Sequence, residues 1–91
     1  MYQIIFTNQF KKDYKLCESR HYKIELLDNL LIELAEKGTV PAKNSSHTLK
    51  GKLSGSWEAH IQPDWLLVWE KDTKEKTITL LGTGTHSDLF K

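Results

Sequence analysis

The sequence predicts an α+β domain in which two N-terminal helices pack on a small, twisted, mostly antiparallel sheet, in the order β-α-α-β-β-β. Three observations lead to this prediction. A short segment of alternating residues opens the chain, two segments with apolar residues at helical spacing follow, and alternating or apolar segments separated by polar turns complete it. Composition does not shift along the chain, so we expect residues 1–91 to form a single domain.

The N-terminal half supplies one strand and two helices. Residues Tyr2–Thr7 alternate as a strand does, and Thr7 or Asn8 can cap the first helix because its side-chain oxygen can accept a backbone N–H. We expect the second helix to begin at Ser19 or a neighbour and to end at Gly38, which readily adopts a left-handed conformation. Both helices have apolar residues every three or four positions, namely Phe10, Tyr14 and Cys17 in the first, and Ile24, Leu27, Leu31 and Leu34, flanked by Leu26 and Leu30, in the second.

The most informative stretch is a predicted hairpin in the C-terminal half. Residues Trp57–Gln62 alternate, so one face of this strand goes to the core while the other displays His60. Pro63–Asp64 forms the turn, because proline cannot donate to a sheet and aspartate favours turns. The next run, Trp65–Trp69, is apolar on both faces and predicts a covered central strand. We therefore expect His60 and Asp64 at the same end of the sheet.

The end of the chain is less regular. We expect a polar turn at Lys71–Glu75 and a last strand at Lys76–Leu81, after which Gly82–Thr85 leaves the sheet. His86 then follows flexible backbone, so a downstream residue must hold it. Leu89 and Phe90 lie three and four positions from His86, which fits a single closing turn, and Leu89 is the better candidate to anchor this turn on the core.

Composition and charge exclude several classes of protein. The chain has 13 basic and 12 acidic side chains and a formal net charge of +1, which predicts no strong attraction to polyanions. No apolar run is long enough to cross a bilayer, and the N-terminus lacks the features of a secretory signal. The single cysteine, Cys17, excludes an internal disulfide and fits a reducing, cytoplasmic location. The four histidines are too scattered for a metal signature, so we expect no metal and no cofactor.

A local excess of positive charge lies in the long irregular segment 39–56. No acidic residue falls between Glu36 and Glu58, whereas Lys50, Lys52 and other basic side chains do. Such a segment can contact phosphate groups. On composition alone, it can equally be a solvated loop.

Three histidines lie where irregular backbone meets a predicted strand. His47 precedes the hairpin, His60 lies near its turn, and His86 follows the last strand. Histidine transfers protons near neutral pH, and two such groups suffice to cleave RNA through attack by its own 2′-hydroxyl. Each histidine by itself also fits an ordinary surface position. The residues alone therefore indicate a candidate acid–base site for a phosphodiester and no more.

Three longer motifs are more specific: HTLKG at His47–Gly51, HIQPDWLL at His60–Leu67 and TGTHSDLF at Thr83–Phe90. They resemble the signature blocks of the YafQ toxins, a group within the RelE superfamily of bacterial type II toxin–antitoxin systems, and the likeness covers almost the whole chain. The resemblance implies a RelE-like fold and a ribosome-dependent endoribonuclease that enters the A site and cuts mRNA without a metal. It also implies a DinJ- or RelB-like antitoxin that silences the toxin in a hetero-oligomeric complex.

Matching positions assign roles by resemblance. The residues that correspond to the family's catalytic residues are His47, His60, Asp64 and His86. We expect His60 and His86 to transfer protons and His47 to bind the scissile phosphate. Asp64 would orient or tune a histidine, or take a proton itself.

Other residues are candidates for RNA binding. Trp65 and Phe90 correspond to family residues that matter for toxicity, and stacking on a base contributes roughly 1–3 kcal/mol. A tryptophan in a strand, such as Trp65, is also a common core residue. Lys50 and Lys52 are available to stabilise charge on the phosphate.

Two positions depart from the family's pattern. YafQ-like chains often have arginine directly before the Thr-Gly-Thr-His motif, where this chain has Gly82, and arginine shortly before the hairpin histidine, where it has Ser56-Trp57-Glu58. The one arginine, Arg20, is expected far from the site. Charge stabilisation would then fall to Lys50, Lys52 or a protonated histidine, although lysine does not reproduce arginine's planar fork.

Two other functions stay open. One is a ParE-like gyrase poison that uses the same scaffold without RNA chemistry, and the retained histidines argue against it. The other is a catalytically weak RNA- or ribosome-binding module, which the missing arginines favour.

Overall fold

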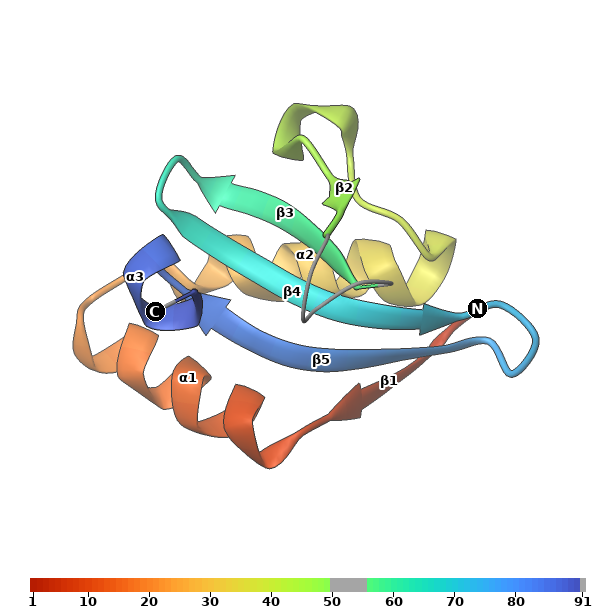
Figure 1. Ribbon diagram of the computed structural model, residues 1–91, viewed down its shortest axis with the longest axis horizontal. Helices are drawn as coiled ribbons and strands as arrows, with labels where there is room; N and C mark the ends of the chain where they lie inside the picture. Colours follow the sequence, from red (N-terminus) through yellow and green to blue (C-terminus); the bar gives the residue numbers. More distant parts are fainter. Residues whose placement is uncertain (50–55, 91) are drawn as a thin grey trace.

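The computed structural model describes residues 1–49 and 56–90, so Lys50 and Lys52 lie outside the described residues. The elements follow in the order β1 (Gln3–Phe6), α1 (Asn8–Ser19), α2 (Ile24–Lys37), the short 3₁₀ helix η1 (Ala42–Asn44), β2 (His47–Thr48), β3 (Trp57–Gln62), β4 (Trp65–Asp72), β5 (Thr77–Gly84) and α3 (His86–Leu89) (Figure 1). The predicted order is confirmed, and η1, β2 and α3 add to it.

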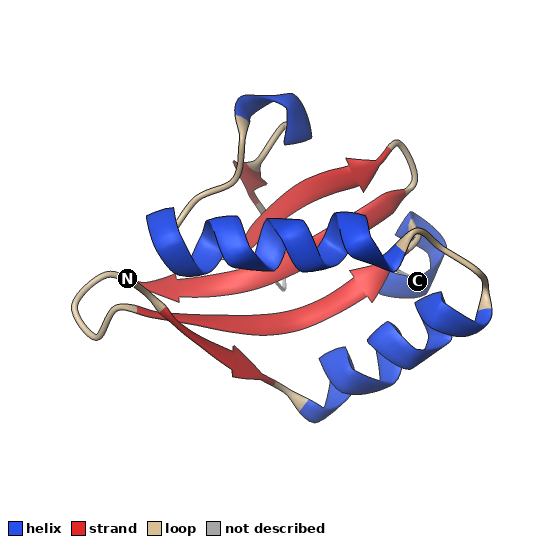
Figure 2. Ribbon diagram, turned by 180° about the vertical axis from the view of Figure 1, so that it is seen from behind, coloured by secondary structure: helices blue, strands red, loops and turns tan. Residues whose placement is uncertain are grey.

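Within the described residues, five strands form one sheet in the order β1-β5-β4-β3-β2. β1 runs parallel to β5, and the other neighbouring pairs are antiparallel. Figure 2 shows α2 lying across one face of the sheet, with α1 beside it near β1. The predicted architecture, two helices on a mostly antiparallel sheet, is confirmed.

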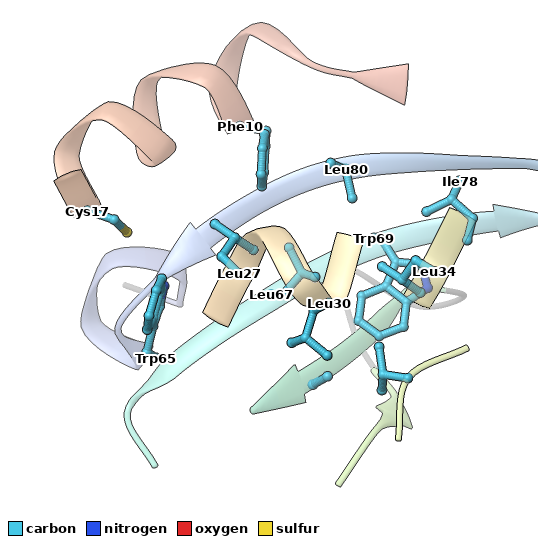
Figure 3. Close-up of a cluster of buried hydrophobic side chains, with 12 residues drawn as sticks. Phe10, Cys17, Leu27, Leu30, Leu34, Trp65, Leu67, Trp69, Ile78 and Leu80 are labelled. Atoms are coloured by element: carbon cyan, nitrogen blue, oxygen red, sulfur yellow. The ribbon is translucent and has the colours of Figure 1, made fainter. Parts of the chain in front are cut away.

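The core lies between these helices and the sheet (Figure 3). β4 is buried from Trp65 to Trp69, as its apolar run predicts for a central strand. The buried helical residues are Phe10 and Cys17 in α1 and Leu27, Leu30 and Leu34 in α2, so Leu30 takes the buried position expected for Leu31. Burying one large apolar side chain contributes about 1.5–3 kcal/mol. This packing fixes the face of β3 that carries Ala59 toward the core and leaves Glu58 and His60 on the opposite face.

The helix boundaries correct one expectation. Thr7 is the N-cap of α1, and its hydroxyl accepts the backbone N–H of Phe10 at 3.1 Å. Ser19 does not begin α2: it ends α1, and its hydroxyl donates to the Leu16 carbonyl within the same helix at 2.7 Å. Gly38 ends α2 with φ at 72°, as predicted. No helix in the described part of the chain is long and apolar enough to cross a membrane.

The last strand is longer than expected. The prediction that Gly82–Thr85 leaves the sheet was wrong, because β5 continues to Gly84, which pairs with Leu66 of β4. Strand pairing uses backbone groups, so a glycine can stay in the ladder when the neighbouring strand is long enough to meet it. The preceding turn also starts later than Lys71, because β4 runs to Asp72.

Candidate active site

Four aromatic rings form a row at one end of the sheet. The ring centroids are 6.4 Å apart for His47 and His60, and 5.9 Å apart for His60 and His86. The ring of Phe90 lies 6.4 Å from that of His86. β2, β3 and α3 each supply one histidine, so the fold brings together all three histidines that the sequence marked as candidates.

His86 is held by Asp64, 22 positions upstream. One oxygen of Asp64, Oδ1, accepts the backbone N–H of His86 at 3.0 Å and lies 2.6 Å from Nδ1 of its ring. These two contacts, the backbone one first, hold the pKa of the Asp64 carboxyl below its usual value. The expectation that a downstream residue holds His86 was therefore incomplete. With Nδ1 donating to the carboxylate, Nε2 of His86 is left to face a substrate.

His60 has a second, weaker anchor on the hairpin turn. Its Nδ1 lies 3.3 Å from the Pro63 carbonyl, which suits a ring protonated at Nδ1 with a lone pair on Nε2. The backbone carbonyl of His60 accepts a hydrogen bond from the Asn44 side chain at 2.8 Å, which ties this end of β3 to η1. Beside the ring lies an open hollow of about 500 Å³ lined by Lys43, Ser45 and neighbouring residues.

Sequence reasoning missed Glu58 as a member of the site. β2 pairs with β3 so that His47 lies directly opposite Glu58, and Nε2 of His47 is 2.8 Å from Oε2 of Glu58. The Glu58 side chain is only 7% exposed, whereas that of His47 is 55% exposed. Nδ1 of His47 also faces an oxygen, the Thr48 carbonyl at 3.2 Å, so each ring nitrogen lies near an oxygen that can accept a hydrogen bond. Alternation could have placed Glu58 beside His60, but only the β2–β3 register adds His47.

The candidates for RNA binding separate into three groups. Trp65 is 2% exposed and lies in the core, where its indole N–H donates to Thr83 at 3.0 Å, so it has no ring face to offer a base. Phe90 is 40% exposed at the end of the histidine row. Lys50 and Lys52 lie outside the described residues, so their contact with phosphate stays a prediction.

Arg20 lies close to the site, contrary to expectation. Its guanidinium donates to both oxygens of Asp88 at 2.6 and 3.2 Å, and Asp88 is two positions from His86 on α3. Helical spacing places Arg20 at the end of α1, but it does not reveal that this end packs beside α3. At Gly82, where YafQ-like chains often have arginine, a larger side chain would be crowded. A Cβ there would lie 2.9 Å from Asp13 Oδ2.

The fold also changes the expectation about metals. Although the histidines are scattered in sequence, His47, Glu58 and His60 each bring one donor atom to a cluster in which these atoms lie within 4.8 Å of one another. Strand pairing, which the spacing of histidines does not reveal, creates this cluster.

A comparison with solved structures identifies the fold. A YoeB/ParE toxin from Agrobacterium tumefaciens has the same fold, with a TM-score of 0.75 at 15% identity over 92% of this chain and 98% of that one. This chain therefore has the same fold as that toxin.

The family follows from closer matches. The profile of the family described as "Bacterial toxin of type II toxin-antitoxin system, YafQ" matches residues 2–91. The mRNA interferase toxin YafQ of Escherichia coli K12 is 34% identical over 88 residues, which cover 96% of this chain and 94% of the relative. The chain belongs to the YafQ family of type II toxin–antitoxin toxins, and the resemblance seen in its motifs is confirmed.

Solved structures agree with this membership. The crystal structure of the E. coli DinJ–YafQ complex matches with a TM-score of 0.90 at 33% identity, over all of both chains. The crystal structure of a metal-bound toxin from Helicobacter pylori matches with a TM-score of 0.89 at 34% identity, over 99% of this chain and 100% of that one.

Proposed function

We propose that this chain is an endoribonuclease that cuts mRNA on the ribosome, with His60 and His86 as its proton-transfer pair. The observation that supports this most is the orientation of the two rings. Nδ1 of each ring faces an oxygen of the hairpin turn, from Pro63 or Asp64, and the ring centroids lie 5.9 Å apart. Both Nε2 atoms are thereby available to one substrate.

The reaction needs one proton acceptor and one proton donor. His60 accepts the proton of the 2′-hydroxyl as the 2′-oxygen forms a bond to the adjacent phosphorus. The bond from phosphorus to the 5′-oxygen breaks, and His86 donates a proton to that oxygen. A histidine that donates this proton carries a positive charge beforehand. The Asp64 carboxylate faces the His86 ring and can stabilise that charge, which suits His86 to the donor role. The products are a 2′,3′-cyclic phosphate and a 5′-hydroxyl end.

His47 is the proposed phosphate contact. Its exposed ring lies beside His60, and the buried Glu58 carboxylate faces it from the other side. When it is protonated, this ring can stabilise the charge that develops on the phosphate oxygens. Phe90 can stack on a base next to His86.

The ribosome and an antitoxin are the proposed partners. With a net charge of +1, the free chain attracts RNA weakly, so the ribosome must supply position and orientation. The E. coli YafQ structure in complex with DinJ supports a DinJ-like antitoxin for this toxin. Action on translated mRNA would take place in the bacterial cytoplasm.

The test is cleavage of a defined mRNA on translating ribosomes, with the new ends mapped. We expect 5′-hydroxyl ends, and a loss of about 10²-fold or more in rate for His60→Ala and His86→Ala. The control is His21→Asn, which removes an exposed histidine outside the row and keeps a residue type that tolerates its positive φ. Unchanged cleavage by both alanine variants would remove these histidines from the mechanism.

A catalytically weak binding module is the second candidate, because no arginine other than Arg20 occurs in the chain and Arg20 is paired with Asp88. Ribosome binding without new RNA ends would favour it. DNA damage without RNA cleavage would instead indicate a gyrase poison.

A further inference from the structure

His47, Glu58 and His60 form a cluster of three metal-ligating side chains on the face of the sheet opposite the helices. The register of β2 on β3 sets His47 beside Glu58, and His60 lies two positions further along β3 on the same face. Each residue offers one donor atom, and all three atoms lie within 4.8 Å of one another. Because Zn–N and Zn–O bonds are about 2.0–2.2 Å long, small side-chain rotations bring these atoms around one ion.

The chemistry of the donors selects the kind of ion. Two imidazole nitrogens and one carboxylate, with no thiolate, suit Zn²⁺, Cu²⁺ or Ni²⁺ rather than Mg²⁺ or Ca²⁺, which prefer oxygen ligands. The Glu58 carboxylate is largely buried, so a divalent cation would stabilise a negative charge that water hardly reaches. The exposed side of His47 leaves an entrance and a position for water as a further ligand.

We propose that His47, Glu58 and His60 bind one divalent transition-metal ion, with zinc as the probe, and that the bound ion switches off RNA cleavage. The second half of this inference rests on the proposed function. A histidine nitrogen that coordinates a metal has no lone pair left to accept a proton, so the metal and the 2′-hydroxyl compete for His60. The ion also takes the place beside His47 where the scissile phosphate would bind.

Binding is coupled to a proton. Nε2 of His47 and Oε2 of Glu58 now share a hydrogen bond at 2.8 Å, and a metal at this position displaces the proton between them into solvent. His86 stays outside the cluster because its ring is held on Asp64. The cluster and the proton donor can therefore be altered separately.

The first experiment measures zinc binding by calorimetry on chelator-treated protein, without any RNA. We expect one zinc per chain, and we expect protons to be released because metal ligands must be deprotonated to bind. Glu58→Gln preserves size and a hydrogen bond but removes the charge, and His47→Ala removes an exposed ligand; each should weaken binding by at least about tenfold. His86→Ala and His21→Asn are matched controls that should bind zinc as the parent does.

Full-strength binding by both Glu58→Gln and His47→Ala, or a loss of binding in His21→Asn alone, would overturn the site. The second experiment adds zinc to the ribosome-dependent cleavage reaction, with an unrelated ribonuclease as a control for effects on the ribosome and RNA. Cleavage should fall as the site fills and recover when a chelator is added. Zinc bound at the cluster without any loss of cleavage would overturn the switch. If the metal-free chain cuts no mRNA, the proposed function fails, while the calorimetry still decides the metal site.

Discussion

Arg20 and Asp88, 68 positions apart in sequence, form an ion pair in which both carboxylate oxygens accept hydrogen bonds from the guanidinium. The same carboxylate accepts the backbone N–H of Thr85 at 2.9 Å and so closes the capping box at the start of α3. Arg20 is the residue that caps the end of α1. The only arginine in the chain therefore ties α1 to the short helix that presents His86.

Replacing Arg20 should lower activity by disturbing the position of α3. We expect Arg20→Gln to reduce the turnover of ribosome-bound mRNA by about tenfold, because small displacements of a reacting group are costly in rate. Arg20→Lys should restore part of this loss, since lysine keeps the charge but not the paired geometry. The NMR chemical shifts of the His86 ring should differ between Arg20→Gln and the parent.

The matched control for Arg20 is Lys12→Gln, which removes a positive charge from an exposed position of α1. It should leave turnover and the chemical shifts of the His86 ring unchanged. Equal losses in both variants would show that general attraction to RNA, rather than the position of α3, explains the effect.

Stability should fall in acid because of the two carboxylates around α3. Arg20 and then the Thr85 backbone hold the pKa of Asp88 well below the ordinary value of 3.8, and contacts from His86 lower the pKa of Asp64. A carboxyl whose pKa is lowered in the folded state contributes stability that is complete above its unfolded value and is lost as the pH falls through the folded value. We expect the free energy of unfolding to decline below about pH 4.

Urea unfolding at pH 7 and pH 3 measures this decline. Asp88→Asn should make the difference between the two pH values smaller, because its stabilising charge is absent at both. Glu70→Gln, at an exposed position of β4, should leave the difference as in the parent. A decline that is the same in all three proteins would assign the acid sensitivity to other groups.

Substitutions of Leu89 and Phe90, the last two apolar residues, should differ in their effect on stability. Phe90→Ala removes an exposed ring beside His86 and should reduce cleavage by about tenfold or more, since one stacked base is worth roughly 1–3 kcal/mol. Leu89 is partly buried on α3, so Leu89→Ala should cost activity and also about 1–2 kcal/mol of stability, less than a fully buried leucine. Thermal melts and cleavage rates check both. A large drop in melting temperature for Phe90→Ala would mean that its ring is part of the packing.

Trp65 should behave as a core residue. Trp65→Ala removes a buried ring that packs on Tyr22 and donates to Thr83, and it should cost about 3–5 kcal/mol. Trp65→Phe keeps much of the ring but not the N–H, so its loss of stability should be smaller. Circular dichroism during heating measures both. A Trp65→Ala protein that melts like the parent but cuts no mRNA would instead place the indole against RNA.

Local sequence patterns were enough to predict the class of fold and the hairpin at its centre. Periodicity separates helix from strand within a few residues, and Gly38 and Pro63–Asp64 mark breaks that any tertiary arrangement must respect. The same local rules placed His60 and Asp64 at one end of the sheet, and the motifs around them indicated the toxin family before any geometry was known.

The way in which distant segments meet depends on the folded structure. The partner of His86 is Asp64, the partner of His47 is the buried Glu58, and the end of β5 is set by where β4 begins. Arg20, expected far away, reaches α3 because the end of α1 packs beside it. Local patterns encode which face of an element is apolar, but the register between strands and the approach of two chain ends depend on packing of the whole core, which no short stretch of sequence specifies.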